Sequence, residues 1–313
     1  MRSCRRINEK NEKNDENEKF LSLRRRCISN EFRLPFCLLK QTMNMQHLTN
    51  DVKQQIGELS AVAQLLWERG WAESNAGNIS INITGKLESF GSGGKHFSQQ
   101  PLPKQYPGIA KAQILVTGAG TRMRDVAAQP ASTLVLIEIN QDGSAYSIMQ
   151  DDINNHGLLP TSELATHLAI YQERCIQKNS VKAIVHTHPT EFIALTHVPE
   201  LLHEQTLNAV LWKIHPEAMI ANPAGIGFVP YILTGTEALA QATVSALRNH
   251  SLALWEKHGC IAAAETVGDA FDLIDVANKA AHIYLLCRNA GIVPEGLTDA
   301  QLEELRHKAI KAR

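Results

Sequence analysis

Apolar residues recur at helical spacing in the first part of the chain that has a regular pattern. From Thr49 onward the apolar positions are separated by three or four residues: Val52, Ile56, Leu59, Ala63 and Leu66. This spacing predicts an amphipathic helix that ends near Gly70. A turn rich in Asn and Gly follows at Ser74–Asn78. The alternation of Ile79, Ile81 and Ile83 then predicts a strand.

Short apolar runs and longer amphipathic segments are intermingled along the rest of the chain. Strands are predicted at Ile114–Val116, Leu134–Ile139, Ala145–Met149, Val181–His186, Ile226–Pro230 and Leu252–Trp255. Helices are predicted from Pro160 to about Gln172 with a hydroxyl residue as the cap, from Pro189, through Val210–Trp212, and over Thr236–Asn249, Val267–Asn289 and Thr298–Lys311. Residues 84–112 are rich in Gly, Pro and polar side chains, which favours a long loop.

The order of these elements favours one fold class over another. Gln141–Ser144 is a hairpin turn that joins two consecutive strands. Consecutive antiparallel strands among helices indicate an α/β fold with a mixed or antiparallel sheet covered by helices, rather than a doubly wound parallel sheet. We find no internal repeat and no sign of a second domain, so we expect one domain over residues 45–313.

The N-terminal segment differs from this body. Residues 8–19 are a low-complexity polar stretch that cannot bury enough surface to fold alone. Residues 1–44 hold 11 Lys and Arg against 6 Asp and Glu, whereas the remainder holds 20 against 26. We expect residues 1–44 to be a disordered extension. A start codon placed too early would account for it, with Met43 or Met45 as the natural start.

Composition narrows the classes of protein that fit. The 44% apolar and 20% charged residues are ordinary for a soluble globular protein. No run approaches the length of a transmembrane helix, and a mildly acidic body gives no support for nucleic-acid binding. Six cysteines without CxxC pairs fit a reducing cytoplasm better than a disulfide framework.

Three histidines could form a metal site. His186 and His188 are two residues apart at the end of a predicted strand, so both side chains point to one side. His258 lies just past another strand. Three neutral imidazoles with an open coordination position suit catalytic Zn²⁺. The alternative is that these are scattered strand-end residues in a chain of 13 histidines, because the sequence does not show that the two loops meet.

Glu163 is a candidate general base, in the segment Pro160–Leu164. In the first turn of a helix, Glu is commonly a member of a capping box or a favourable partner of the helix dipole. The functional alternative is a base beside the metal, with its proton affinity set by the ion and a partly dry pocket.

Several fragments could bind a phosphate. Asn-Gly turns, Gly-rich strand ends and helix N-termini present backbone N–H groups to anions, although each is also routine structure. The candidates are Asn75, Asn78, Gly120, Thr161 and Ser162. The remaining histidines, His167 among them, lack such spacing and are expected to be surface or core residues.

Five motifs in order resemble the class II aldolase/adducin family. They are Asn75–Asn78, Val116–Gly120, Pro160–Glu163, His186–His188 and His258–Gly259, and the resemblance extends from about Thr49 to about Gly291. Within the family, the long segment after the second strand, Leu195–Trp212 and Gly225–Pro230 are most similar to the members that cleave L-rhamnulose 1-phosphate.

The resemblance implies a fold, a site and a reaction. It implies a three-layer fold with a mainly antiparallel sheet between helices, assembled as a homotetramer with active sites between subunits. It implies that His186, His188 and His258 hold zinc and that Glu163 is the base. It also implies that the five phosphate candidates bind a sugar phosphate, and that Glu217 acts from a neighbouring subunit. Ala119 departs from the pattern, which has a serine at that position.

These implications lead to an expected reaction and its rivals. We expect retro-aldol cleavage of L-rhamnulose 1-phosphate to dihydroxyacetone phosphate and L-lactaldehyde. Other members of the family use the same metal on another sugar, as fuculose-1-phosphate aldolases, ribulose-5-phosphate 4-epimerases or methylthioribulose-phosphate dehydratases. A rival of another class is the adducin-like interaction domain, which lacks the histidine ligands.

Overall fold

The computed structural model describes residues 48–87, 99–149 and 158–311, so the predictions for residues 1–44 lie outside the described residues. The strands are β1 (Asn78–Asn82), β2 (Gln100–Pro101), β3 (Gln113–Thr117), β4 (Leu134–Ile139), β5 (Ala145–Ile148), β6 (Ala183–Thr187), β7 (Gly227–Val229), β8 (Leu252–Trp255) and β9 (Gly259–Ala264). The α-helices are α2 (Asn50–Glu68), α3 (Met123–Ala128), α4 (Leu164–Ile176), α5 (Thr190–Leu195), α6 (Glu204–Ile214), α7 (Pro216–Ala221), α8 (Glu237–Leu247), α9 (Val267–Asn289) and α10 (Asp299–Lys311).

The strands form one sheet in the order β2-β5-β4-β3-β1-β6-β9-β8-β7. Each neighbouring pair is antiparallel except β7 and β8, which are parallel. The predicted hairpin is present as β4–β5. The prediction of a mainly antiparallel sheet, rather than a doubly wound parallel one, is therefore confirmed.

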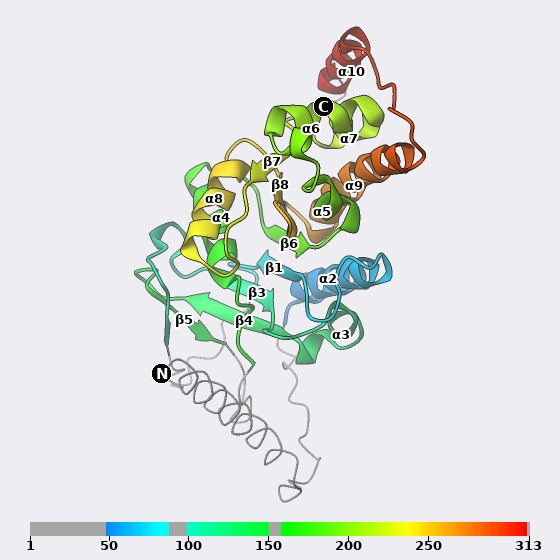
Figure 1. Ribbon diagram of the computed structural model, residues 1–313. Helices are drawn as coiled ribbons and strands as arrows, with labels where there is room; N and C mark the ends of the chain where they lie inside the picture. Colours follow the sequence, from blue (N-terminus) through cyan, green and yellow to red (C-terminus); the bar gives the residue numbers. More distant parts are fainter. Residues whose placement is uncertain (1–47, 88–98, 150–157, 312–313) are drawn as a thin grey trace, which may run out of the picture. The chain divides into compact units, whose positions relative to one another are not determined.

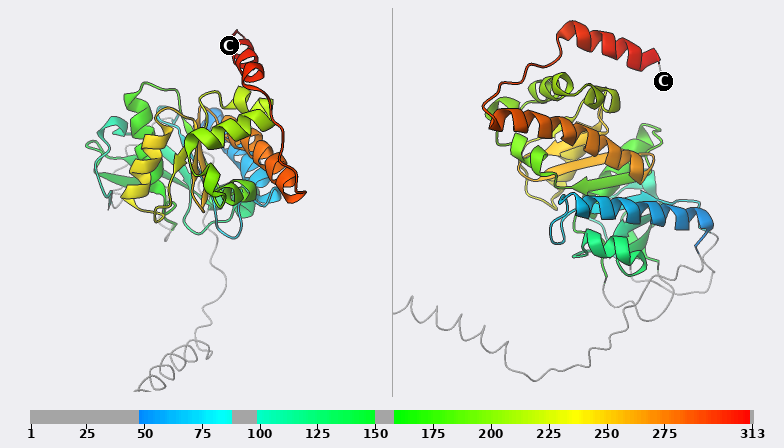
Figure 2. Two further views of the ribbon diagram at one scale, coloured as in Figure 1. Left: turned by 45° about the horizontal axis from the view of Figure 1, so that its top comes forward. Right: turned by 90° about the vertical axis from the view of Figure 1, so that its right-hand side faces the viewer.

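Helices cover both faces of this sheet (Figure 1). On one face, α2, α3, α5, α6, α7 and α9 contribute buried apolar side chains to a single core cluster. Figure 2 shows α2 and α9 lying across this face. On the other face, α4 and α8 pack with the short helix Pro107–Ile109 over a second cluster. Alternate strand residues supply the two clusters, as the pleat requires: Leu134 and Leu136 face the first, and Val135 and Ile137 the second.

The first helix shows how local sequence determines these elements. Thr49 is the N-cap of α2, and its side chain accepts a hydrogen bond from the backbone N–H of Val52. The apolar stripe that predicted the helix is buried against the sheet. Gly70 follows with φ +70°, a conformation that glycine adopts without steric cost. None of the described helices is long and apolar enough to cross a membrane.

The structure corrects the predicted start of one helix and adds elements that were not predicted. Helix α4 begins at Leu164, not at Pro160, because Pro160 forms an antiparallel bridge with Gly118 and Thr161 donates its N–H to the Thr117 carbonyl. The backbone then turns at Ser162 and Glu163, and the N-cap residue is Glu163, which makes no side-chain capping bond, rather than a hydroxyl residue. Strands β2 and β9 and the short helices α3 and α7 were not predicted.

Candidate metal centre

The functional candidates converge at one edge of the sheet because of the strand directions. Strand β1 is antiparallel to both β3 and β6, so the start of β1 meets the ends of β3 and β6. Strand β9 is antiparallel to β6 and β8, so the end of β8 lies at the same edge. Asn78, at the start of β1, is directly opposite His186.

His186, His188 and His258 come together at this edge. Their ligand nitrogens all lie within 4.8 Å of one another, and their ring centroids are 4.8–5.0 Å apart. The Nε2 atoms of His186 and His188 are 3.2 Å apart. The alternative, that these histidines are scattered, is wrong.

A tight turn between β8 and β9 delivers His258. Lys257 has φ +58°, and Gly259 lies so close to the Thr187 carbonyl that a Cβ would not fit there. The indole of Trp255, at the end of β8, packs against the rings of His186 and His258 at centroid distances of 4.5 and 5.1 Å. This packing fixes both rings before any ligand binds.

Hydrogen bonds set the tautomers of the first two histidines. His186 Nδ1 lies 2.8 Å from the Cys260 carbonyl, which can only accept, so this nitrogen carries the proton. His188 Nδ1 lies 3.0 Å from a carboxylate oxygen of Glu73 and donates to it in the same way. Both Nε2 lone pairs are therefore left for a metal ion.

The electrostatics also favour neutral ligands. Burial, reinforced by His188, lowers the pKa of His186 to about 3. Burial and the neighbouring histidines lower the pKa of His258 to about 4. Burial raises the pKa of Glu73, but the hydrogen bond from His188, a backbone hydrogen bond and the charges of His188 and His258 together outweigh it, and the net pKa is lowered. The Glu73 carboxylate is therefore the acceptor for His188 Nδ1–H, as at many metal sites.

The donor set fits a zinc ion. Tetrahedral ligands at the usual Zn–N distance of about 2.0–2.1 Å are separated by about 3.3 Å, and the two Nε2 atoms are 3.2 Å apart. Three imidazoles with room for a fourth ligand are typical of catalytic rather than structural zinc sites.

Glu163 faces this group from the residue before α4. Glu163 is 7% exposed, and its Oε2 lies 3.4 Å from His186 Nε2. The same oxygen accepts a hydrogen bond of 2.9 Å from the amide nitrogen of Asn78. Glu163 makes no side-chain capping bond to α4. The interpretation of Glu163 as a capping-box residue is therefore wrong.

The phosphate candidates lie around the same edge in different environments. The bridge between Gly118 and Pro160 sets the end of β3 beside Thr161, so Gly120, Thr161 and Ser162 belong to two adjoining segments. Gly120, with φ +73°, and Ser162 are exposed, and Thr161 is partly buried. Asn75 is exposed in the loop before β1.

Asn78 differs from the other phosphate candidates because it is only 5% exposed. Both ends of its amide are engaged inside the chain. The nitrogen donates to Glu163, and the oxygen lies 2.6 Å from His167 Nε2.

Glu217 is exposed at the start of α7. This helix packs against α6, α9 and α10, on the side of the molecule that carries the first core cluster. A role from a neighbouring subunit stays a prediction.

Two residues at the site were missed in the sequence. Glu73 precedes the Asn-Gly turn and carried no signal beyond its nearness to it. His167 is four residues after Glu163, a spacing that puts both on one face of a helix, and this signal could have identified it.

Comparison with known proteins assigns the family. The sequence model described as "Class II Aldolase and Adducin N-terminal domain" matches residues 57–285. The rhamnulose-1-phosphate aldolase of Bacteroides thetaiotaomicron is 35% identical over 253 residues, which cover 80% of this chain and 93% of that protein. The enzyme of the same name from Yersinia pseudotuberculosis is 36% identical, covering 76% and 86%.

A solved structure agrees with these relatives. The crystal structure of a sugar-phosphate aldolase from Thermotoga maritima is 33% identical with a TM-score of 0.67, covering 78% of this chain and 99% of that one. The family match, the relatives and the fold concur. The chain therefore belongs to the class II aldolase/adducin family and is a class II aldolase, a carbon–carbon lyase.

Proposed function

We propose that this aldolase uses zinc to cleave L-rhamnulose 1-phosphate to dihydroxyacetone phosphate and L-lactaldehyde. One observation carries the proposal: Glu163 faces a cluster of three histidines, in a chain that matches 93% of the length of a relative named for this sugar phosphate. The match extends over nearly the whole of that relative.

His186, His188 and His258 would hold the ion. When bound there, Zn²⁺ would supply Lewis-acid stabilisation of the negative charge that develops on the ketose oxygens. The protein prepares for this by lowering the pKa of His186 and His258 through burial and by orienting the rings of His186 and His188 through Cys260 and Glu73.

Glu163 would transfer the proton to and from C3. Cleavage of the C3–C4 bond converts the C4 hydroxyl to an aldehyde, releases the hydroxyl proton to solvent and leaves the electron pair at C3. Glu163 in its acid form would give a proton to C3 and become the carboxylate. In the condensation direction the carboxylate removes that proton again. The hydrogen bond from Asn78 holds the carboxylate at its place beside His186.

The phosphate would bind at the edge formed by Gly120, Thr161 and Ser162, with Asn75 and Asn78 on the β1 side. Backbone N–H groups of a glycine turn and hydroxyl side chains suit a dianion. Ala119 supplies no hydroxyl, and its own N–H already donates to the Leu159 carbonyl. We therefore expect a weaker phosphate site than one with serine at this position, and an unchanged chemical step.

We also propose a homotetramer in which Glu217 of one subunit acts on the aldehyde half in the next. Glu217 is exposed, and Tyr231 and Leu233 near the end of β7 are more than half exposed apolar side chains that an interface would cover. Sedimentation equilibrium and the loss of activity in Glu217→Ala would test this.

We expect the protein in a reducing cytoplasm, as its thiols suggest. Cys175, Cys260 and Cys287 are free cysteines. Burial raises the pKa of Cys260, which keeps it a thiol beside the metal ligands.

The substrate is tested by initial rates of dihydroxyacetone phosphate release from L-rhamnulose 1-phosphate and L-fuculose 1-phosphate, with zinc content measured in the same samples. We expect the first rate to be at least about tenfold higher, a difference of roughly 1.4 kcal/mol in barrier. A higher rate on the fuculose sugar would reassign the substrate. No cleavage of either with zinc present would point to the epimerase or dehydratase reactions, and absence of bound metal to an interaction domain.

A further inference from the structure

A chain of side-chain hydrogen bonds leads away from Glu163 into the protein. Glu163 accepts from Asn78 at 2.9 Å, and Asn78 Oδ1 lies 2.6 Å from His167 Nε2. His167 Nδ1 lies 2.7 Å from Ser80 Oγ, which lies 2.9 Å from the Tyr171 hydroxyl. All five side chains are buried, and Ser80 and His167 have no exposed surface.

Two regular periods bring these residues together. Asn78 and Ser80 are two apart, so both point from β1 toward α4. Glu163, His167 and Tyr171 are four apart and share the face of α4 that looks back at the sheet. The hydrogen-bonded residues therefore come alternately from the helix and the strand, and neither element could form this series of hydrogen bonds alone.

The bonds have one consistent direction when Glu163 is ionised. A carboxylate only accepts, so the Asn78 nitrogen must face it and the Asn78 oxygen must face His167. Nε2 of His167 then carries the proton, and Nδ1 is unprotonated and accepts a hydrogen bond. The Ser80 hydroxyl donates to Nδ1, so its oxygen can accept a hydrogen bond from Tyr171. Each link fixes the orientation of the next, back to Glu163.

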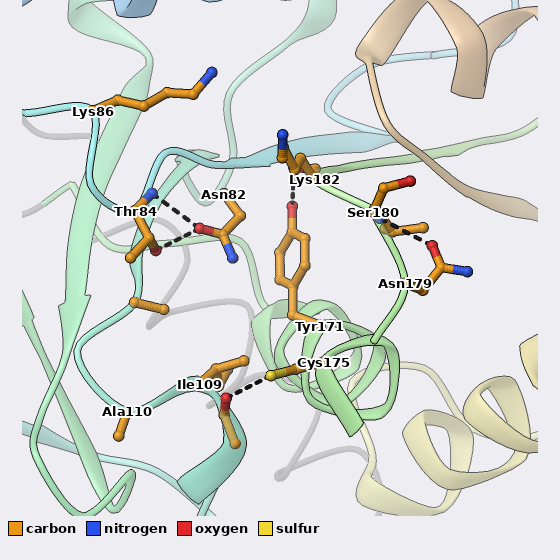
Figure 3. A pocket seen from close by; sticks show the side chains of 13 residues that line it. Asn82, Thr84, Lys86, Ile109, Ala110, Tyr171, Cys175, Asn179, Ser180 and Lys182 are labelled. Carbon is orange, nitrogen blue, oxygen red and sulfur yellow. Dashed lines mark hydrogen bonds between the residues drawn. The ribbon is translucent and has the colours of Figure 1, made fainter. Parts of the chain in front are cut away.

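The far end of the chain is fixed by Tyr171. Its hydroxyl lies 3.2 Å from the Lys182 carbonyl as well as 2.9 Å from Ser80, so its single proton is shared between two acceptors. Burial raises the pKa of Tyr171, which keeps the phenol protonated. Tyr171 also lines a cavity of about 400 Å³ whose wall includes Cys175 and Asn179 (Figure 3).

We propose that His167, Ser80 and Tyr171 are positioning residues for Glu163, which hold the Asn78 amide with its nitrogen toward the carboxylate. The proposal rests on the proposed function, because it takes Glu163 as the base. It differs from a purely structural role in one respect: the direction of each bond matters, and not only its presence.

His167 suits this task because it stays neutral. Burial lowers the pKa of His167 to about 3, although Glu163 acts in the opposite direction. A protonated ring would donate from both nitrogens and break the bond from Ser80. The neutral ring keeps one donor and one acceptor throughout the pH range in which the enzyme would work.

Replacement of His167 separates position from packing. In His167→Leu the Asn78 oxygen has no partner and the amide is free to turn. We expect kcat to fall about 10- to 100-fold, as for other residues that orient a catalytic group, with KM and zinc content unchanged. His167→Gln can donate to Asn78 and accept from Ser80, so we expect it to keep at least about ten times the turnover of the leucine variant. Equal kcat in both variants would overturn the proposal.

Ser80→Ala keeps His167 and removes only the donor to its Nδ1. This variant therefore tests the series of hydrogen bonds if His167→Leu does not fold. We expect the same fall in kcat at its low end, about tenfold. Cys175→Ala is the matched control, because Cys175 is on the same helix and lines the cavity but takes no part in the series of hydrogen bonds from Glu163 to Tyr171. Its kcat should equal that of the parent, and a fall like that of Ser80→Ala would contradict the proposal.

A double-mutant cycle shows whether His167 acts through Glu163. In the Glu163→Gln background, His167→Leu should change kcat by less than about twofold, because the base is already gone. A further fall as large as in the parent would overturn the proposal.

A crystal structure of the zinc-bound His167→Leu variant does not depend on the substrate. We expect the Asn78 amide to have turned or moved away from Glu163, and an unchanged pair at 2.9 Å would overturn the positioning role. Absence of cleavage by the parent enzyme, together with a displaced Asn78 in the variant, would sink the proposed function and leave the positioning role in place.

Discussion

The two faces of strand β1 have opposite characters. Ile79 and Ile81 point into the core under α2 and α9, so this face of the strand is apolar. Asn78 and Ser80 point to the α4 side and are just as buried, at 5% and 0% exposure. A strand with alternating polar and apolar residues usually has one solvent-exposed and one buried face. Here both faces are buried, and the polar face packs against polar side chains of a helix.

The difference assigns separate tasks to the two faces. Apolar burial on the α2 side contributes stability without direction. A buried polar group contributes little net stability, because it trades bonds with water for bonds with protein. The polar face is therefore best explained by what it orients, which is Glu163. If the two faces have these separate tasks, changes on the polar face should lower turnover and changes on the apolar face should lower stability.

The largest effect is expected from Glu163→Gln at the end of the polar face. Gln can still accept from Asn78, so the site keeps its shape, but it can neither give a proton to C3 in cleavage nor remove it in condensation. We expect turnover to fall at least about 10²-fold, the low end for a positioned acid or base, with zinc still bound. Near-normal turnover, measured with metal analysis of the same sample, would remove Glu163 from the role of base.

The apolar face should show the reverse behaviour in Ile81→Ala. Ile81 is 3% exposed, and removal of a buried isoleucine side chain typically costs about 2–5 kcal/mol of unfolding free energy. The site residues lie at the edge of the sheet, so we expect kcat to be unchanged. Urea denaturation at a fixed protein concentration and initial rates would check both. A stable variant with low kcat would mean that the two faces are not separate.

The fold was predictable because it depends on period and order. The helices α2 and α9 followed from the sequence pattern and the β4–β5 hairpin from its turn residues, and the hairpin argued against a doubly wound sheet. Strand β9 was missed because Gly259–Ala264 is small and lacks alternation. The start of α4 was placed too early because a proline and two hydroxyl residues resemble a helix start, whereas Pro160 pairs with Gly118 and the helix begins only after the turn at Ser162 and Glu163.

The site was predictable only in part. The spacing of His186 and His188 implied one side of a strand, but the approach of His258 depends on the β8–β9 pairing, which is a long-range contact. Ser80 carried no signal, since a serine in an alternating strand is ordinary, and His167 could be identified only through its four-residue spacing from Glu163. Their role emerges only where β1 packs on α4.

The pH dependence of stability gives a smaller test of the polar face. His167 has a pKa of about 3 in the folded protein against about 6.5 in the unfolded chain. Below pH 6.5 the unfolded state binds a proton that the folded state does not. Stability is therefore lost as pH falls from about 6.5 toward 3.

His167→Gln removes this one term and leaves those of the other histidines. Between pH 7 and pH 5 we expect the parent to lose about 2 kcal/mol more unfolding free energy than the variant. Urea titrations of both proteins, stripped of metal by a chelator and held at one protein concentration, would measure it. A parallel loss in both would mean that His167 is already protonated in the folded protein.

The smallest effect should come from Glu73, which lies beside the proposed metal site and belongs to neither face of β1. Its carboxylate accepts from His188 Nδ1 at 3.0 Å but its side chain is 66% exposed. Water can replace much of that bond when Glu73→Ala removes it. We expect zinc affinity in chelator competition to fall about tenfold, the low end for an outer partner of a metal-binding histidine. Glu73→Gln keeps an acceptor without the charge, so it should lie between the two. Equal affinity in all three proteins would mean that the strand end alone fixes the tautomer of His188. A loss far beyond about 100-fold would mean instead that Glu73 is itself a ligand.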